Sequence, residues 1–593
     1  MSWGKPARRR TAAAPARGGA APGKPSFALR SGFVAGVFVL LGMALVARAV
    51  HLQVFNTDFL NRQAAARHLR VATLAATRGS IVDRNGEPLA ASTPVDSVWV
   101  DPPQVLEAPE RIPALAAALD KDPQELTARL TRNVGKHFLY LARHVNPAVA
   151  ARVAALDIPG VQLMREYRRY YPAGEVTGHL LGFTNVDDRG QEGLELAFDN
   201  YLQGVPGRKK VLRDRLGRVV EDVESIDLPR PGGTLVSSID LRIQYLAHRE
   251  LKAALQQHKA SSGSVVVLDV TTGEVLAMVN QPAYNPNARG RPDSQITTDA
   301  LRNRAVTDIL EPGSTLKPLI VAAALESGRF RPTSRIDTNP GVIRVGSKDI
   351  EDKHNYGVMD LATILAKSSN VGATMVAMQL DREFLWNSLA RLGIGRLSGS
   401  GFPGESAGVL PHFQNWRPIT QATVAYGYGL SMTPLQLAQS YAVLGGSGLY
   451  RPASLVRLDK PPIARRVMAP ETARAVVTMM EQVIGPDGTG QQAAVAGYRV
   501  AGKTGTARKL GAGGYAQDRH TAVFAGLAPV TDPRFAIAVI IDDPRGGVYF
   551  GGQVAAPVFS SVAAGSLRIM AIPPDAPVVP DGKAPLTIAA VAP

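Results

Sequence analysis

The sequence predicts an α+β protein with a single transmembrane helix, an α+β amino-terminal domain, and a larger domain whose central antiparallel sheet is flanked by helices. Three observations carry this prediction. An uncharged apolar run follows a basic amino terminus, apolar strand patterns stand at both ends of region 233–573, and helical patterns fill the interval between them. Strands from both ends of one region can share a sheet if the intervening helices form a lobe beside it.

The composition excludes several kinds of chemistry. The 593 residues include no cysteine, which rules out a disulfide scaffold, a thiol nucleophile, an iron–sulfur cluster and a cysteine-built zinc site. The ten histidines form no HExxH pair and no other recognisable ligand spacing. We therefore expect neither a metal nor another cofactor.

The net charge of +16 is concentrated at the amino terminus, where residues 1–30 contain seven basic and no acidic residues. Such a cluster can be a solvated tail, or it can bind nucleic acid or anionic lipid. The apolar run that follows favours a membrane rather than nucleic acid. We expect residues 1–30 to be a basic cytoplasmic tail.

The apolar run extends from Phe33 to Ala47 without a charge and continues past Arg48 to Phe55. Counted to Val50 it is about 18 residues long, enough to span a bilayer. A cleaved signal peptide is the alternative, because residues 47–49 read Ala-Arg-Ala. The long basic region and the arginine inside that motif favour an uncleaved anchor over 31–54. The positive-inside rule then places the rest of the chain outside the cytoplasm, in a bacterium on the periplasmic side of the inner membrane.

Residues 55–232 are predicted to form an α+β domain without a cluster of nucleophile and base. Residues 112–131 have helical spacing, and residues 78–86 place an Asp-Arg-Asn-Gly turn after a short strand. The Arg-Pro-Gly-Gly sequence at 230–233 marks the expected boundary with the larger domain. We expect the Pro- and Ala-rich residues 574–593 to be a disordered tail.

The larger domain, 233–573, opens with a predicted hairpin of strands 264–270 and 274–280 joined by a Thr-Thr-Gly turn. Two further apolar strands are predicted at 521–528 and 535–542, and an apolar helix at 557–572 closes the domain.

Residues 497–504 fit the phosphate-loop pattern GxxxxGK[ST] letter for letter. That pattern binds phosphate only where a helix opens at the lysine. Here a glycine-rich run follows, and the alternation before Lys503 is typical of a strand that continues through it. We therefore expect no nucleotide binding.

Ser314 and Lys317 precede an apolar helical run and are spaced to share one helix face. A serine hydroxyl needs a base, and Lys317 could serve if burial and a second cation lowered its pKa from about 10.4 towards 7–8. The positive end of the helix would favour an anionic transition state beside Ser314. Taken alone, the pair is better explained as a capping serine with a surface lysine.

Two more motifs follow in the same region: Ser368-Ser369-Asn370, and Lys503-Thr504-Gly505-Thr506. SxxK, SxN and KTG in this order resemble the set of the penicillin-binding proteins. Residues 78–86, 168–172, 190–195 and 427–436 are similar to further motifs of the class B members. The basic tail, the single anchor and the lack of a glycosyltransferase domain also resemble class B, and in particular its division-specific peptidoglycan D,D-transpeptidases.

The resemblance implies that Ser314 attacks the D-Ala–D-Ala peptide of a stem peptide and becomes acylated, with Lys317 as its base. Ser368 would pass a proton to the leaving amine, and Lys503 would supply a second positive charge. β-Lactams would acylate the same serine.

The resemblance also implies the substrate contacts. Asn370 would hydrogen-bond the substrate amide, and Thr504 and Thr506 would bind its carboxylate. The backbone N–H groups of Ser314 and Thr506 would form the oxyanion hole. Gly505 would let the substrate lie close along the strand, where any Cβ would intrude.

Alternatives remain at this point. The same acyl-serine chemistry serves D,D-carboxypeptidases and β-lactamases, non-enzymatic β-lactam sensors, and the class B transpeptidases of cell elongation. For the septal role, the pedestal or dimerisation-type domain 55–232 would dock a polytopic FtsW-like glycan polymerase and other divisome proteins. Its alternative role is a spacer.

Phe550 stands where the family leads us to expect a tyrosine, so that wall of the cleft is expected to differ, although plain aromatic packing also explains the phenylalanine.

Overall fold

The structure is a computed structural model that describes residues 27–52, 69–213, 219–289, 297–511 and 514–576. Most of the predicted basic tail and of the predicted tail 574–593 lies outside these ranges. The chain divides into two compact units, one of residues 1–73 with 208–228 and one of residues 74–207 with 229–593.

The first unit contains the predicted anchor as helix α1 (Phe27–Val50), which is 24 residues long. A helix of that length rises about 36 Å, more than the hydrocarbon thickness of a bilayer. Residues 30–50 have a mean hydropathy of 2.3 and none of their side chains is buried. The same unit contains a sheet in the order β1 (Leu69–Leu74), β6 (Gly207–Arg213), β7 (Val219–Asp227).

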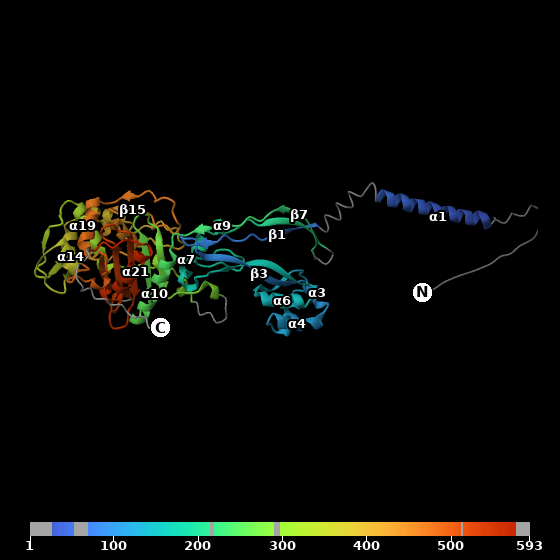
Figure 1. Ribbon diagram of the computed structural model, residues 1–593, viewed down its shortest axis with the longest axis horizontal. Helices are drawn as coiled ribbons and strands as arrows, with labels where there is room; N and C mark the ends of the chain where they lie inside the picture. The colour runs from blue at the N-terminus through green and yellow to red at the C-terminus, as the bar shows by residue number, and fades with distance from the viewer. Residues whose placement is uncertain (1–26, 53–68, 214–218, 290–296, 512–513, 577–593) are drawn as a thin grey trace, which may run out of the picture. The chain divides into compact units, whose positions relative to one another are not determined.

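In the second unit, the amino-terminal part is built around strand β3 (Pro88–Val100), which pairs antiparallel with β2 (Ile81–Val82), β4 (Leu139–Val145) and β5 (Val161–Tyr170). Helices pack against this sheet around a core that includes Val98, Leu115 and Leu130 (Figure 1). They are α3 (Pro102–Leu106), α4 (Ile112–Ala118), α5 (Pro123–Arg132) and α6 (Pro147–Ala155), and short α7 (Gly178–Leu181), α8 (Gly193–Ala197) and α9 (Asp199–Leu202) follow.

The predicted helix 112–131 is two helices, α4 and α5. The chain turns at Asp120, whose φ is +55°, and Asp122 caps α5 by accepting a hydrogen bond from the backbone N–H of Glu125. Pro123 occupies the first turn of α5, where its missing N–H costs nothing. Asp122 and Pro123 therefore start a second helix within the predicted one.

The predicted turn at 83–86 is confirmed, and it joins the amino-terminal part to the larger domain. Asp83 Oδ1 accepts hydrogen bonds from the backbone N–H groups of Asn85 and Glu87, which closes the turn. Asp83 Oδ2 accepts from the N–H of Leu241, and β2 pairs in parallel with β8 (Leu235–Val236).

Three of the motif stretches meet in a buried ion cluster. Glu195 is fully buried, and its two carboxylate oxygens accept hydrogen bonds of 2.7 Å from Arg78 Nε and 2.6 Å from Arg169 Nε. Asp199 provides a second carboxylate 2.6 Å from Arg78. Buried charges persist only where they are paired in this way, so these residues hold the amino-terminal part together.

The larger domain contains the predicted antiparallel sheet, in the order β10-β9-β19-β18-β17. The two predicted pairs of strands are β9 (Ser262–Asp269) with β10 (Val275–Gln281), and β18 (Gly514–Ala528) with β19 (Phe535–Asp542). β19 pairs with β9, which brings the two ends of the region together as predicted. The edge strand β17 (Ala501–Gly511) carries Lys503.

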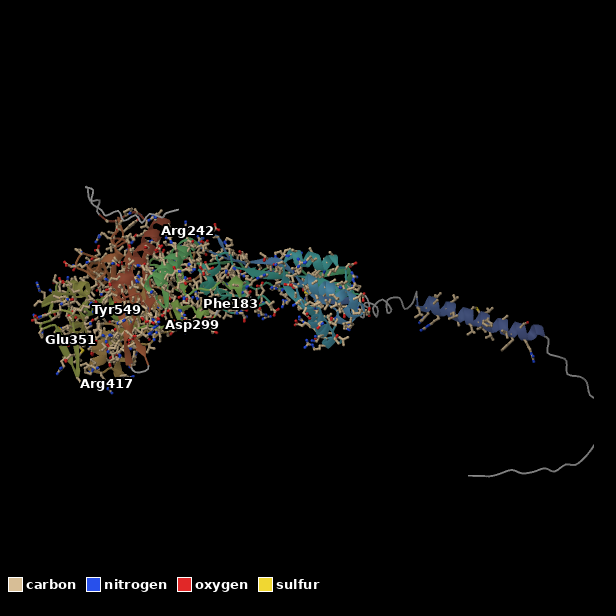
Figure 2. All side chains as sticks on the ribbon, turned by 90° about the horizontal axis from the view of Figure 1, so that it is seen from below. Phe183, Arg242, Asp299, Glu351, Arg417 and Tyr549 are labelled. Carbon is tan, nitrogen blue, oxygen red and sulfur yellow. The ribbon has the colours of Figure 1, made fainter. Side chains whose placement is uncertain are left out.

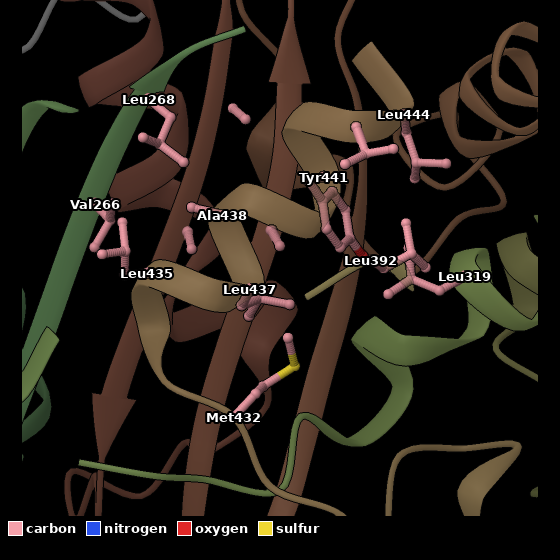
Figure 3. Close-up of a cluster of buried hydrophobic side chains, with 14 of the residues drawn as sticks. Val266, Leu268, Leu319, Leu392, Met432, Leu435, Leu437, Ala438, Tyr441 and Leu444 are labelled. Carbon is pink, nitrogen blue, oxygen red and sulfur yellow. The ribbon is translucent and has the colours of Figure 1, made fainter. Parts of the chain in front are cut away.

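Side chains alternate between the two faces of this sheet, and each face has its own core. Val265 and Val267 face α10 (Leu241–His258) and α21 (Ala556–Ile569), whereas Val266 and Leu268 face the helical lobe. Figure 3 shows the lobe side, where Leu435, Leu437 and Tyr441 of α18 (Pro434–Gly445) approach the strands.

The lobe and its connections comprise the remaining helices and strands. The helices are α11 (Thr298–Leu301), α12 (Arg304–Thr307), α13 (Lys317–Glu326), α14 (Leu361–Lys367), α15 (Asn370–Met378), α16 (Arg382–Arg391), α17 (Pro418–Val424), α19 (Pro470–Glu481) and α20 (Gly551–Val554). The short strands are β11 (Arg335–Asp337), β12 (Val342–Val345), β13 (Lys348–Glu351), β14 (Val358–Asp360), β15 (Leu449–Tyr450) and β16 (Arg465–Arg466).

Candidate active site

Ser314 lies on a 3₁₀ turn (Gly313–Leu316) that leads directly into α13. The sequence predicts the serine at the start of a helix, and the structure places it on the turn just before that helix. In a 3₁₀ turn residues three apart lie on the same side, so the predicted alignment of Ser314 with Lys317 holds. Ser314 is half-buried, and its hydroxyl makes no hydrogen bond to a residue in the described part of the chain.

Lys317 is fully buried beneath the serine. Its Nζ donates to the carbonyl oxygen of Ser368 at 2.5 Å and to Oδ1 of Asn370 at 2.7 Å, and lies 3.3 Å from Ser368 Oγ. Burial, together with the nearby charge of Lys503, holds the pKa of Lys317 well below its usual value, while the charge of Asp352 opposes that shift. A lysine in this setting can be neutral at physiological pH and accept a proton.

Ser368 and Asn370 lie at the predicted helical junction. Ser368 follows α14 in the left-handed region, with a φ of +59°, and Ser369 caps α15 by accepting from the N–H of Gly372. This turn points both the carbonyl and the hydroxyl of Ser368 towards Lys317.

Asp352 supports that junction and was not found from the sequence. Its carboxylate accepts hydrogen bonds of 2.5 Å from both Ser369 Oγ and the backbone N–H of Asn370, and one of 3.2 Å from the N–H of Val371. A carboxylate at a helix amino terminus is a stabilising arrangement, but nothing in the local sequence shows that Asp352 would reach α15.

Lys503 lies on strand β17, as its alternating pattern predicts, and is fully buried. Its Nζ donates to Ser368 Oγ at 2.9 Å and to the carbonyl of Thr504 at 3.1 Å. Burial lowers the pKa of Lys503 to about 7. The hydroxyl of Ser368 thus contacts two lysines. This row of hydrogen-bonded groups can carry a proton between Lys317 and the cleft.

Thr504 and Thr506 point from β17 towards the cleft. Thr504 Oγ1 lies 2.8 Å from Thr489 Oγ1, and Thr506 Oγ1 accepts a hydrogen bond from the N–H of Gly551 at 3.0 Å. Hydroxyls held in this way can bind a carboxylate.

Gly505 serves a different purpose from the one the sequence suggests. A Cβ at this position would lie 3.0 Å from both the carbonyl oxygen of Pro312 and Cγ2 of Thr315, so it would press against the chain beside Ser314. The expectation that it would obstruct substrate is therefore wrong. The glycine lets β17 approach the segment that carries the nucleophile.

A cleft of about 780 Å³ opens over these residues. Ser314, Ser368, Asn370, Thr504 and Thr506 line it, whereas Lys317 and Lys503 lie beneath its surface. Within the described residues, no group of three or more His, Asp or Glu side chains is placed to hold a metal ion.

Aromatic side chains form one wall of the cleft. His520 stacks on Tyr549 with ring centroids 4.1 Å apart, Phe550 lies beside Tyr549, and the ammonium of Lys353 is 4.4 Å from the centre of the Phe550 ring. Phe550 both packs against Tyr549 and lines the cleft. Glu351 and Tyr549, labelled in Figure 2, mark two points on its lining.

Comparison with known proteins agrees with this arrangement. Residues 263–564 match the penicillin binding protein transpeptidase domain, and residues 73–237 match the penicillin-binding protein dimerisation domain. The chain is 46% identical over 545 residues, 91% of each chain, to the peptidoglycan D,D-transpeptidase FtsI of Escherichia coli. It is 42% identical to the probable peptidoglycan D,D-transpeptidase PenA of Neisseria gonorrhoeae, covering 91% of this chain and 93% of that one.

A solved structure of the transpeptidase domain of penicillin-binding protein 3 from Burkholderia pseudomallei is 41% identical, with a TM-score of 0.53. It covers 57% of this chain and 98% of that one. With a dimerisation domain followed by a transpeptidase domain, and with both relatives similar over nine-tenths of the chain, the protein belongs to the class B penicillin-binding proteins.

Proposed function

We propose that the protein is a peptidoglycan D,D-transpeptidase that cross-links stem peptides through an acyl-serine at Ser314 and is acylated at the same residue by β-lactams. One observation carries the assignment: Ser368 Oγ lies within hydrogen-bonding distance of two buried lysines, Lys317 and Lys503, beside a serine that lines an open cleft.

In the first half of the reaction, Ser314 Oγ attacks the carbonyl carbon of the penultimate D-alanine, and Lys317 takes the hydroxyl proton. The C–N bond then breaks, and the leaving amine receives a proton through Ser368. The lowered pKa of Lys317 suits the first proton transfer, because a neutral amine must accept the proton of Ser314 near neutral pH.

The substrate contacts follow from the same geometry. Thr504 and Thr506 would bind the terminal carboxylate in the field of Lys503, and Asn370 would hydrogen-bond the peptide amide. The backbone N–H groups of Ser314 and Thr506 would stabilise the oxyanion. In the second half, an amine of another stem peptide attacks the acyl-enzyme and completes the cross-link.

Labelling with a fluorescent penicillin tests the assignment. Ser314→Ala should abolish the covalent label, whereas Ser388→Ala, on the remote helix α16, should leave it intact. A thioester donor with a D-amino acid acceptor then distinguishes the alternatives by mass spectrometry. A transpeptidase forms the aminolysis product, a hydrolase forms only the acid, and a sensor forms neither. A label that persists on Ser314→Ala would assign the site elsewhere.

We further propose that residues 1–30 are cytoplasmic, that 31–54 anchor the protein in the inner membrane, and that the rest is periplasmic. The seven basic residues before the apolar helix support this orientation. A reporter fused to the amino terminus should be active only in the cytoplasm. Activity only in the periplasm would reverse the topology.

The remaining proposal concerns the cellular role and the domain limits. We propose a pedestal over 55–232 and a transpeptidase domain over 233–573, with the pedestal docking an FtsW-like glycan polymerase and other divisome proteins. The name FtsI of a relative 46% identical supports a septal role. Depletion of the protein should give filaments with unfinished septa; round cells that still divide would indicate elongation.

A further inference from the structure

Ser314 lies on a short turn in which one backbone carbonyl has no donor of the usual kind. The turn Gly313–Leu316 leads into α13, whose first turn contains Pro318. In a 3₁₀ turn, a carbonyl accepts from the N–H three residues later. The carbonyl of Ser314 accepts in this way from the N–H of Lys317. The residue three after Thr315 is Pro318, which has no N–H to donate.

Tyr441 of α18 supplies a donor to that carbonyl from another part of the chain. Its hydroxyl donates to the carbonyl oxygen of Thr315 at 2.8 Å, and both residues are fully buried. Water does not compete for a hydrogen bond in such a place, and removing the donor leaves a buried acceptor without it. The bond therefore joins the residue that follows the nucleophile to a helix of the lobe.

The fold holds the Tyr441 hydroxyl in one position. Helix α18 packs against β9, β18 and β19, and a capping box of Thr433 and Gln436 begins the helix. The ring of Tyr441 belongs to the cluster of buried side chains that Figure 3 shows, which also contains Leu437 and, from α13, Leu319. A buried aromatic side chain has few rotamers, so its hydroxyl is a fixed donor.

Thr315 is also fixed by contacts other than the one to Tyr441. Its Oγ1 donates to the carbonyl of Pro312 at 2.7 Å, and this bond is buried as well. Strand β17 lies close on the same residues, since a Cβ at Gly505 would be 3.0 Å from both the Pro312 carbonyl oxygen and Cγ2 of Thr315. The turn that carries Ser314 is thus held by its own side chain, by β17 and by α18.

The reacting atoms depend on how this turn is held. This step rests on the proposed function, in which Ser314 Oγ is the nucleophile and the N–H of Ser314 stabilises the oxyanion. Both groups belong to the residue next to Thr315, so a rotation of the turn would move them together. We propose that Tyr441 is a positioning residue for acyl transfer, which fixes the turn so that Ser314 Oγ and its N–H meet the donor carbonyl in the reactive geometry.

Positioning affects the rate more than the affinity. The misplacement of a nucleophile by a fraction of an ångström lowers the rate of the chemical step, because that step needs alignment of the reacting atoms. The binding of the substrate before the reaction depends on other contacts, and these do not involve Tyr441. A slower first-order acylation with unchanged binding is therefore the signature of the proposed role.

A role in stability alone is the alternative, and Tyr284 provides the matched comparison. Tyr284 is 3% exposed, and its hydroxyl donates to the carbonyl of Gly178 at 2.9 Å. It therefore makes the same kind of buried bond as Tyr441, but neither Tyr284 nor Gly178 lines the cleft. Loss of either hydroxyl should lower stability, whereas only the loss at Tyr441 should slow acylation of the molecules that remain folded.

Rapid-quench kinetics of the full-length protein test the proposal. Acylation by a fluorescent penicillin is followed over a range of concentrations, which separates the dissociation constant of the first complex from the first-order rate of acylation. The variants are Tyr441→Phe, Thr315→Val and the control Tyr284→Phe. Rates refer to active sites titrated on the same samples, thermal unfolding is measured in parallel, and a thioester donor repeats the series.

We expect Tyr441→Phe to slow first-order acylation about tenfold or more with both donors, and to change the dissociation constant by less than about twofold. Thr315→Val should slow it about threefold or more, since it removes the bond to Pro312. Tyr284→Phe should lower the melting temperature and leave acylation within about twofold of wild type. The pH profile of Tyr441→Phe should match that of wild type, because burial, Lys503 and Asp352 determine the pKa of Lys317.

A Tyr441→Phe rate within about twofold of wild type would overturn the proposal. Equal slowing in Tyr284→Phe, a loss of affinity in place of rate, or a shifted pH profile would overturn it too. If Tyr441→Phe does not fold, Thr315→Val decides in its place, and a rate equal to wild type in that variant contradicts the positioning role. Failure of the wild-type protein to be acylated at Ser314 would instead refute the proposed function, so the two failures are distinguishable.

Discussion

Replacement of Lys317 by methionine tests the mechanism most directly. Lys317 has no exposed surface and makes its polar contacts through Nζ alone. Methionine has a similar volume and no charge, so it removes the base while filling the space. Loss of a positioned base lowers a rate by about a hundredfold to ten-thousandfold, which corresponds to about 2.7–5.4 kcal/mol of transition-state stabilisation.

The substitution also changes the neighbouring lysine. Lys317 and Lys503 both contact the hydroxyl of Ser368 at 3.3 and 2.9 Å, and the charge of Lys503 contributes to the lowered pKa of Lys317. Removing the Lys317 amine leaves Lys503 as the single basic side chain in contact with Ser368 Oγ, so any residual acylation should depend on Lys503.

The assay is the second-order rate of acylation by a fluorescent penicillin, with thermal unfolding measured on the same samples. Lys348→Met, which replaces an exposed lysine on β13, is the control and should match wild type. Lys317→Arg keeps a charge but cannot give up its proton, so it should be as slow as Lys317→Met. A folded Lys317→Met protein that is acylated within about fivefold of wild type would refute the role of Lys317 as base.

Of three further predictions, two concern stability and one concerns the rate of acylation. Glu195→Ala should lower the free energy of unfolding by about 3–5 kcal/mol in urea titrations, because it removes the carboxylate that both buried arginines, Arg78 and Arg169, contact. A loss below about 1 kcal/mol would contradict the ion cluster's role. The folded pKa of Lys503 is about 7, below its unfolded value, so the unfolded chain binds more protons between pH 7 and 10.5 and stability should rise across that range. Unfolding titrations should show a weaker rise in Lys503→Met, and an identical slope would argue against the lowered pKa. Gly505→Ala should slow penicillin acylation, because its Cβ would lie 3.0 Å from the carbonyl of Pro312; a rate equal to that of wild type would show that the strand moves aside freely.

Much of the site could be predicted because its motifs are local. The spacing of Ser314 and Lys317 fixes their alignment within one turn, and the alternation around Lys503 identifies its strand without knowledge of the strand's partners. The sheet was predictable for the same reason, since each apolar strand is continuous in the sequence.

What escaped prediction depends on contacts between distant segments. Asp352 reaches across 18 residues to the backbone of Asn370, and Thr489 meets Thr504 across 15. A single sequence contains no pattern that links such pairs. Gly505 was assigned the wrong neighbour for the same reason, because the atoms that a Cβ would meet belong to Pro312 and Thr315.

The junction between β2 and β8 has a consequence for how force travels through the second unit. The backbone N–H of Arg84 donates to the carbonyl of Ile239, the side chain of Asn85 lies 3.2 Å from Asp240, and Asp83 binds the first N–H of α10. A strand from each side of residue 233 therefore belongs to one ladder, and the helix that begins there packs directly beneath the catalytic sheet. A force on the turn at 83–86 would act on these hydrogen bonds and, through Asp83, on the first turn of α10. Tension applied to the amino-terminal part, by the membrane or by a bound protein, would thus be transmitted through hydrogen bonds to the helix beneath the catalytic sheet. A flexible linker would not transmit it.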